Sequence, residues 1–156
     1  MAMIEYVPVV RIQIVRERSL SAEPTINNTA QALELAKRFF KDLATDREVV
    51  GMATLDTKHH VLSVTVVTQG TLDTSLVHPR ETFKLAILES AASILLFHNH
   101  PSGDPTPSNE DIRVTQAIAK AGDILGIRLL DHLIVGEDIE NRAISLRETH
   151  PHAFNG

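Results

Sequence analysis

Residues 93–111 read SILLFHNHPSGDPTPSNED. The run from Ser93 to Phe97 is short and apolar, which is typical of a strand covered on both faces of its sheet. It leads directly to His98-Asn99-His100, so polar side chains stand at the end of a buried strand. The Pro- and Gly-rich residues after them predict a loop, and the apolar periodicity from Ser108 onward predicts a helix.

Four residues of this stretch follow the spacing H-x-H-x7-S-x2-D. Histidines at i and i+2 of an extended segment can point their rings the same way, and an Asp in the first turn of the next helix can close on them. Two imidazoles and a carboxylate leave a fourth position for water, as in catalytic zinc sites. The spacing therefore predicts zinc held by His98, His100 and Asp111. Ser108 would lie beside the water site and donate to charge that develops on a substrate oxygen.

Two simpler interpretations compete with this one. Ser108 and Asp111 alone fit a helix capping box, but capping does not explain why the preceding strand ends in two imidazoles. The letters His98-Asn99-His100 also match the name of the HNH nucleases, whose residues are dispersed over a ββα unit rather than contiguous. The metal site is therefore the preferred hypothesis.

The rest of the chain predicts further strands and helices. Period-2 alternation predicts a strand over residues 8–15, followed by a connecting loop over 19–28. An antiparallel hairpin is expected from 48–55 and 61–68, later strands over 127–135 and 143–146, and helices from Thr29, from Pro79 and from Ser108 to Gly122. The helix faces expected to be buried carry Leu33, Ala36, Phe39 and Phe40; Phe83, Ala86 and Ile87; and Val114, Ala117, Ile118 and Ala121.

Composition narrows the function classes. A chain of 156 residues is long enough for one domain with a real core. It has no cysteine, which excludes disulfides and thiolate metal sites. No apolar run approaches the length of a membrane span, and no secretory signal is readable, so a cytoplasmic protein is expected. A net charge of −5 argues against a dedicated nucleic-acid binder.

The other histidines are expected to have structural positions and no part in the metal site. His59 and His60 are expected to be exposed in a turn, and Asp131-His132 to form a buried, hydrogen-bonded pair. His150 and His152 would lie in a frayed tail.

The run from His98 to Ser108, with Glu110-Asp111, closely resembles the signature of the RadC family, a bacterial branch of the JAB/MPN superfamily with its JAMM metal motif. The resemblance extends from about Val10 to Arg147. Other segments that resemble the family are Asp46-Arg47-Glu48, Leu55–Lys58, Gln69–Leu72, Leu76–Glu81 and Leu129–Ile134.

This resemblance implies a three-layer α/β/α fold of the cytidine-deaminase-like type with a mixed sheet. It also implies that Glu48 is the superfamily's upstream glutamate, a residue that hydrogen-bonds the zinc water and serves as general base and then acid. Gln69–Leu72 and His78–Glu81 either shape a groove near the site or form a plain loop and helix cap. Full-length RadC proteins carry an N-terminal helix-hairpin-helix region, and this chain starts almost directly at the JAB domain, which weakens the DNA-repair association.

The expected organisation is one domain, with an N-terminal strand and loop (1–26), a RadC-like JAB/MPN metal-binding domain (27–149) and a tail (150–156). The first hypothesis is a zinc-dependent JAMM hydrolase that cleaves a peptide or isopeptide bond in an unidentified protein or peptide. The alternative is a non-catalytic, metal-stabilised binding module in DNA repair or mobile-element defence. Deamination ranks last because such enzymes normally use Cys ligands. No membrane partner is expected, DNA has no support from the charge, and the loop over 19–28 with the strand before it could serve a homodimer contact.

Overall fold

A mixed five-stranded sheet forms the centre of the fold in the computed structural model, which describes residues 3, 6–43, 46–70, 77–136 and 142–155. The strands are β1 (Val49–Leu55), β2 (Val61–Gln69), β3 (Ser93–Asn99), β4 (Arg128–Val135) and β5 (Ala143–Ser145). Their order across the sheet is β2-β1-β3-β4-β5. β3 and β4 are parallel, whereas the β1–β2, β1–β3 and β4–β5 pairs are antiparallel.

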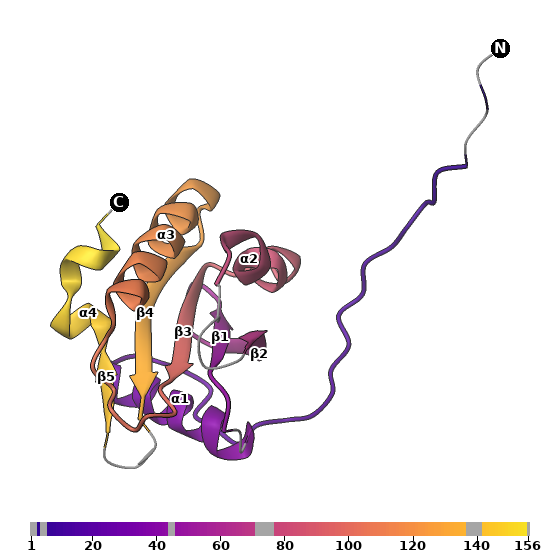
Figure 1. Cartoon of the computed structure of the whole chain (residues 1–156). Helices are drawn as coiled ribbons and strands as arrows, with labels where there is room; N and C mark the ends of the chain where they lie inside the picture. The colour runs from indigo at the N-terminus through magenta and orange to yellow at the C-terminus, as the bar shows by residue number, and fades with distance from the viewer. Residues whose placement is uncertain (1–2, 4–5, 44–45, 71–76, 137–141, 156) are drawn as a thin grey trace.

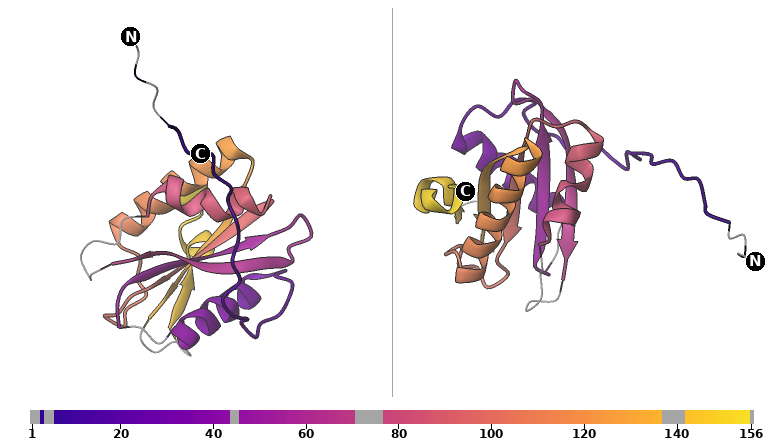
Figure 2. Two further views of the ribbon diagram at one scale, coloured as in Figure 1. Left: turned by 90° about the vertical axis from the view of Figure 1, so that its right-hand side faces the viewer. Right: turned by 90° about the horizontal axis from the view of Figure 1, so that it is seen from above.

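Helices cover both faces of this sheet. Helix α1 (Thr29–Leu43) lies on one face, and α2 (Pro79–Leu88) and α3 (Asn109–Leu125) lie on the other, as the left view of Figure 2 shows. The chain then ends in α4 (Leu146–Thr149) and the 3-10 turn η1 (Pro151–Phe154) beside α3 (Figure 1). The predicted three-layer α/β/α fold with a mixed sheet is confirmed. Among the described residues, no helix has both the length and the apolar character needed to cross a bilayer.

The sheet is apolar on both faces because each helical layer buries its own cluster of side chains against it. Every residue of β1 is buried, as are the first six of β3. On the α1 side, Phe39 packs directly over Gly51 of β1, where a Cβ would lie 2.5 Å from the Phe39 ring. Glycine at this position therefore allows α1 to approach the sheet closely.

The predicted hairpin is confirmed as the antiparallel pair β1–β2, but the predicted strand over residues 8–15 is wrong. Those residues are extended and exposed, and they pair with no strand among the described residues (Figure 1). Alternating apolar side chains indicate that a segment is able to form a strand of a sheet. A strand also needs a neighbouring strand that satisfies its backbone N–H and C=O groups.

The helix faces differ in detail from those predicted. In α1 Leu33 is only half-buried, and the buried stripe runs through Ala32 and Leu35 as well as the predicted Ala36, Phe39 and Phe40. In α2 Ile87 is 54% exposed. Val114 and Ala121 of α3 are half-buried and Ala117 is exposed, because this helix turns Thr115, Ile118 and Ala119 toward the sheet.

Helix α3 also runs further than predicted. Gly122 lies inside it, where a Cβ would meet the Ile127 carbonyl oxygen at 2.3 Å, so this glycine marks a close approach of the backbone rather than a helix end. The helix ends at Gly126, which takes the left-handed conformation (φ 72°) favoured for glycine.

The prediction that His150 and His152 lie in a frayed tail is wrong. Ala153 and Phe154 are buried against α3, and the Arg147 guanidinium lies 3.9 Å from the centre of the Phe154 ring. His150 and His152 therefore lie in a short ordered turn held by apolar burial and a cation–π contact.

Candidate metal site

Strand pairing brings two distant parts of the chain to one end of the sheet. The antiparallel register of β1 and β3 places Val50 opposite His98, so Glu48, just before β1, lies at the same end as the last residues of β3. His100 follows β3, and Asp111 comes from the first turn of α3. The structure thus gathers the residues predicted to form the site.

The four side chains of Glu48, His98, His100 and Asp111, here named the His-carboxylate cluster, are in direct contact. His98 Nε2 is 2.6 Å from Glu48 Oε1, and His98 Nδ1 is 3.2 Å from Asp111 Oδ1. His100 Nε2 is 3.1 Å from Asp111 Oδ2. The His98 and Asp111 side chains are 6% and 7% exposed, against 14% for His100 and 18% for Glu48. Solvent therefore reaches the cluster from the side of Glu48 and His100.

The hydrogen bonds of His100 indicate that a cation fits this cluster. Its Nδ1 is 2.8 Å from the Asp104 carbonyl oxygen, which can only accept, so Nδ1 is the donor. In a neutral ring Nε2 then carries a lone pair that faces Asp111 Oδ2, another acceptor. Two acceptors at 3.1 Å require a proton or a cation between them. Two ligands of a tetrahedral zinc ion would be about 3.3 Å apart, so the donor set and its spacing fit zinc.

The charges of the cluster favour a cation as well. Burial alone would lower the pKa of His98, but hydrogen bonds to Asp111 and Glu48 outweigh it and raise that pKa to about 9. Burial would raise the pKa of Asp111, but hydrogen bonds from His100 and His98 hold it well below its ordinary value. Without a metal the cluster therefore holds an imidazolium between carboxylates, and a divalent ion could replace a proton there.

More than one ligand set can be drawn from the cluster. Glu48, His98 and His100 each offer a ligand atom, and these three atoms lie within 4.8 Å of one another. Asp111 contacts both imidazoles. A metal site that uses the two histidines and a carboxylate is therefore supported, and the choice of carboxylate belongs to the proposal below.

Ser108 and Asp111 form the capping box that the competing interpretation predicts. The Ser108 hydroxyl oxygen accepts from the Asp111 backbone N–H at 3.1 Å, and the Ser108 N–H donates to Asp111 Oδ2 at 2.8 Å. Capping and the metal site are compatible, because the cap orients the carboxylate that faces the histidines. Ser108 is exposed, so its hydroxyl proton can still be donated outward.

The loop between β3 and α3 is built to orient His100. The Asp104 carboxylate accepts from the backbone N–H and the hydroxyl of Thr106, and this turn places the Asp104 carbonyl against His100 Nδ1. Gly103 has φ 88°, a conformation that L side chains rarely adopt. A carbonyl that fixes the tautomer of a histidine is a recurrent second contact of metal ligands.

Asn99, which has no predicted role, lies next to Glu48 in the structure. Its Oδ1 accepts from the Val49 N–H at 2.6 Å, and its Nδ2 donates to the Arg47 carbonyl at 2.8 Å. The two bonds flank Glu48 on both sides. The amide therefore holds the backbone of Glu48 in register with β3.

Replacing Asn99 with Ala should destabilise the chain by about 1–3 kcal/mol, because both bonds are lost and partly buried backbone groups remain. Urea unfolding of the metal-free protein measures this. Asn109→Ala, which removes an exposed amide in the first turn of α3, is the matched control and should leave the unfolding midpoint unchanged. Equal midpoints for the two variants would contradict the role given to Asn99.

His132 is a second residue whose place beside the cluster was not predicted from the sequence. It is buried and bonded to Asp131 as predicted, since its backbone N–H donates to Asp131 Oδ1 at 2.7 Å, and the same carboxylate also accepts from Ser145 and the Arg147 backbone. His132 Nδ1 bonds to Thr115 Oγ1 at 2.7 Å, and its ring stacks on His98 with centroids 5.9 Å apart. Burial lowers the pKa of His132 to about 3, so the ring beneath the cluster is neutral.

Predictions also concerned His59, His60, His78 and a groove near the site. His60 is exposed as predicted and contacts Asp56, whereas His59 is half-buried in the left-handed conformation (φ 61°). His78 precedes α2, and its carbonyl accepts from the Thr82 hydroxyl. The expected groove involves Gln69–Leu72 and His78–Glu81, and because residues 71 and 72 lie outside the described residues, it stays a prediction.

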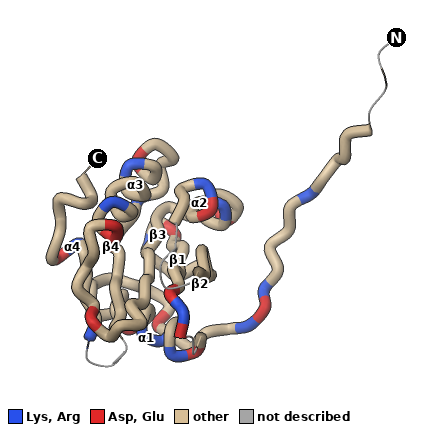
Figure 3. The backbone as a smooth tube through the Cα atoms, in the orientation of Figure 1, with Lys and Arg blue, Asp and Glu red and all other residues tan. Residues whose placement is uncertain are grey.

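Lys and Arg positions alternate with Asp and Glu positions over the helices and the base of the N-terminal segment (Figure 3). Acidic residues outnumber basic ones by 20 to 15. Because binding to a nucleic-acid backbone needs a concentration of positive charge, this distribution gives no support to a DNA partner.

Comparison with known proteins finds a match between residues 26–151 and a family model described as RadC-like JAB domain. A UPF0758 protein of Desulfitobacterium hafniense is 47% identical over 135 residues, which are 84% of this chain and 57% of the relative. A UPF0758 protein of Caldanaerobacter subterraneus is 46% identical over 129 residues, 82% of this chain and 50% of the relative. One of Listeria monocytogenes is 56% identical over 94 residues, 60% and 41% of the two chains. The chain spans about half the length of the curated relatives it matches.

Proposed function

Because the chain belongs to the RadC-like JAB domain family, we propose that it is a zinc-dependent hydrolase that cleaves a peptide or isopeptide bond. The observation that carries this proposal is the contact between His100 Nε2 and Asp111 Oδ2, two acceptors that need a proton or a cation between them. His98 and Glu48 complete the donor set beside this pair.

In this proposal His98, His100 and Asp111 hold the ion, because Asp111 is the carboxylate in contact with both imidazoles. Zinc bound there would supply a Lewis acid for the substrate carbonyl and lower the pKa of a water molecule toward neutrality. The remaining carboxylate, Glu48, is the most accessible member of the cluster.

The chain's own side chains carry the proton transfers. Glu48 takes a proton from the attacking water and passes it to the leaving amine, a task suited to a carboxylate that solvent can reach. Ser108, at the exposed N-terminus of α3, donates its hydroxyl proton to the oxygen that gains charge as the carbonyl carbon becomes tetrahedral. Asn99 acts only through Glu48, whose backbone it holds.

The test uses internally quenched peptides together with lysine conjugates linked through their ε-amino group. The zinc-loaded chain should cleave a subset of them, and removal of the metal or the substitution Glu48→Gln should abolish cleavage. If the zinc-loaded chain and Glu48→Gln do not differ over the whole set, hydrolysis is contradicted, and the metal-stabilised binding module becomes the better hypothesis.

Zinc binding should depend on pH. Since the pKa of His98 is raised to about 9, the ring is protonated at pH 7 and the metal must displace that proton. Zinc affinity should therefore rise about tenfold per pH unit from pH 7 and level off near pH 9. Competition titration against a zinc-sensitive dye measures the slope.

Two variants serve as controls for the rise of zinc affinity with pH. Ser108→Ala leaves both carboxylates beside His98 and should keep it. Glu48→Gln removes one of the two groups that raise the pKa of His98, so its zinc affinity should level off at a lower pH. An affinity of the parent chain that does not change between pH 7 and 9 would show that no such proton is displaced.

A further inference from the structure

An unpaired strand edge and an unpaired strand-forming segment occur in the same chain. β2 is an edge strand of the sheet, and beyond Val61 its outer edge pairs with no other described strand. Residues 7–15, here named the arm, project away from the body of the molecule in Figure 1 and in the right view of Figure 2. Both segments are nine residues long. Proteins usually cover or blunt a long exposed edge, because it is ready to pair with another strand.

The arm has the composition of a strand that another surface should cover. Six large apolar side chains of the arm are 44% to 101% exposed. Val10, Ile12 and Ile14 alternate with polar Arg11 and Gln13, so one face of the arm is apolar and the other is partly polar. This much exposed apolar area on one short segment is typical of an interaction site.

The register at the start of β2 does not bring the chain's own arm onto this edge. Thr25 forms an isolated antiparallel bridge with His60, at the start of β2. Continued in the same register, the bridge would place Arg16 opposite Gln69, so residues 16–24 would use the whole strand and the arm would extend past its end. Residues 18 and 20 are instead held elsewhere, since Arg18 pairs with Asp42 at 3.3 Å and Leu20 packs against the α1-side core.

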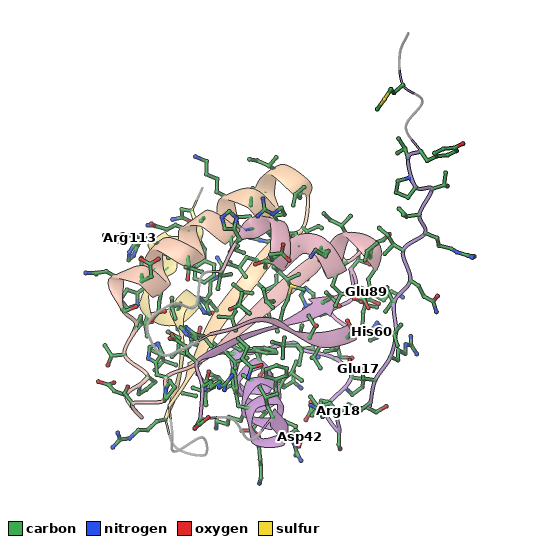
Figure 4. The ribbon with its side chains drawn as sticks, turned by 45° about the vertical axis from the view of Figure 1, so that its right-hand side comes forward. Glu17, Arg18, Asp42, His60, Glu89 and Arg113 are labelled. Atoms are coloured by element: carbon green, nitrogen blue, oxygen red, sulfur yellow. The ribbon has the colours of Figure 1, made fainter. Side chains whose placement is uncertain are left out.

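The two free segments complement each other. Leu62, Val64 and Val66 alternate along one face of β2, and the first and last of them are 41% exposed. On the opposite face the Ser63 hydroxyl donates to Glu89 of the neighbouring α2 end at 2.9 Å. Figure 4 shows Glu89 and His60 on the side of the molecule from which the arm leaves, with Glu17 and Arg18 at its base. An apolar stripe can thus meet an apolar stripe while Arg11 faces an acidic group.

We propose that the arm of one copy adds as a sixth strand to the β2 edge of a second copy, and that the second copy returns its own arm in the same way. Each chain carries both halves of the contact, so a two-fold arrangement satisfies both edges and closes without further growth. Strand addition of this kind takes affinity from backbone hydrogen bonds and specificity from alternate side chains. The occupant of the β2 edge is therefore a second copy of this chain.

The test measures mass in solution for the full chain by sedimentation velocity, from low to high micromolar concentration. We expect a dimer of two 17.2 kDa chains. Ile12→Pro removes an N–H donor and blocks pairing in the arm, and it should weaken dimerisation by at least about a hundredfold. Ile12→Val, which keeps the strand preference and the apolar face, is the matched control and should remain dimeric. Since Ile12 is 70% exposed, neither change should shift the thermal midpoint of the isolated fold.

Hydrogen exchange identifies the contact itself. In the dimer the amides of residues 7–15 and of 62–69 should both be protected, and Ile12→Pro should remove both protections together. A chain that stays monomeric at all concentrations would overturn the proposal, and so would a dimer that survives Ile12→Pro. Protection of the arm in a monomer would show pairing within one chain, and assemblies larger than two would show open-ended growth; either outcome contradicts the two-fold exchange.

Discussion

Asp111→Asn should remove zinc from the protein, with metal content falling from about one ion per chain to less than a tenth. The substitution keeps the size of the side chain and an oxygen that can accept the Ser108 N–H, so the start of α3 is preserved. It removes the negative charge that faces both His98 and His100. An amide is a poor ligand for zinc beside two neutral imidazoles, so the loss in affinity should exceed about a thousandfold.

Elemental analysis after equilibration with buffered zinc measures this loss. Ser108→Ala is the matched control, because it removes the capping oxygen on the other side of the same box and leaves the carboxylate in place. It should cost about 1 kcal/mol of stability and retain the metal. Full zinc content in Asp111→Asn would show that the ion, if bound, uses Glu48 with the two histidines instead.

Glu48→Gln should keep the metal and lose hydrolysis by roughly 10²- to 10⁴-fold, which is the usual contribution of a positioned general base. The amide cannot accept the proton of the attacking water, whereas its size preserves the packing beside His98. The measurement pairs zinc content with the cleavage rate of the best substrate found in the peptide set.

Glu23→Gln provides the control for this second prediction. Glu23 lies in the segment before α1, and its carboxylate bonds to Gln31 on an exposed surface, so neutralising it should change neither metal content nor rate. Loss of zinc in Glu48→Gln would make Glu48 a ligand. Retention of both zinc and the full rate would remove Glu48 from the reaction.

Short-range sequence patterns were enough to predict the strand, loop and helix start over residues 93–111. An apolar run predicts a buried strand, a spacing of two residues turns His98 and His100 the same way, and Ser108 with Asp111 predicts a helix start. Each of these features depends on residues a few positions apart, which local geometry relates directly. The same holds for the β1–β2 hairpin, whose strands are joined by a short turn.

Contacts between distant segments could not be predicted from short-range sequence patterns. Glu48 is 50 residues from His98 and was found only through a family resemblance, because a glutamate before a strand has no local mark of function. Its place follows from the β1–β3 register, and Asn99 reinforces that register from the other strand. His132 lies beneath His98 because β4 runs parallel to β3, a pairing that no local pattern specifies.

The sequence by itself determined which residues can bind a metal and which segments can form strands, since both follow from side-chain chemistry and short spacings. Only the tertiary structure decided which of these possibilities are used. Strand order brought Glu48 to the histidines, whereas residues 7–15 lie apart from the sheet that their alternation would suit, with Arg18 paired to Asp42 and Leu20 packed against the α1-side core. Backbone hydrogen bonds and burial both need a partner, and the position of a partner is a property of the whole fold.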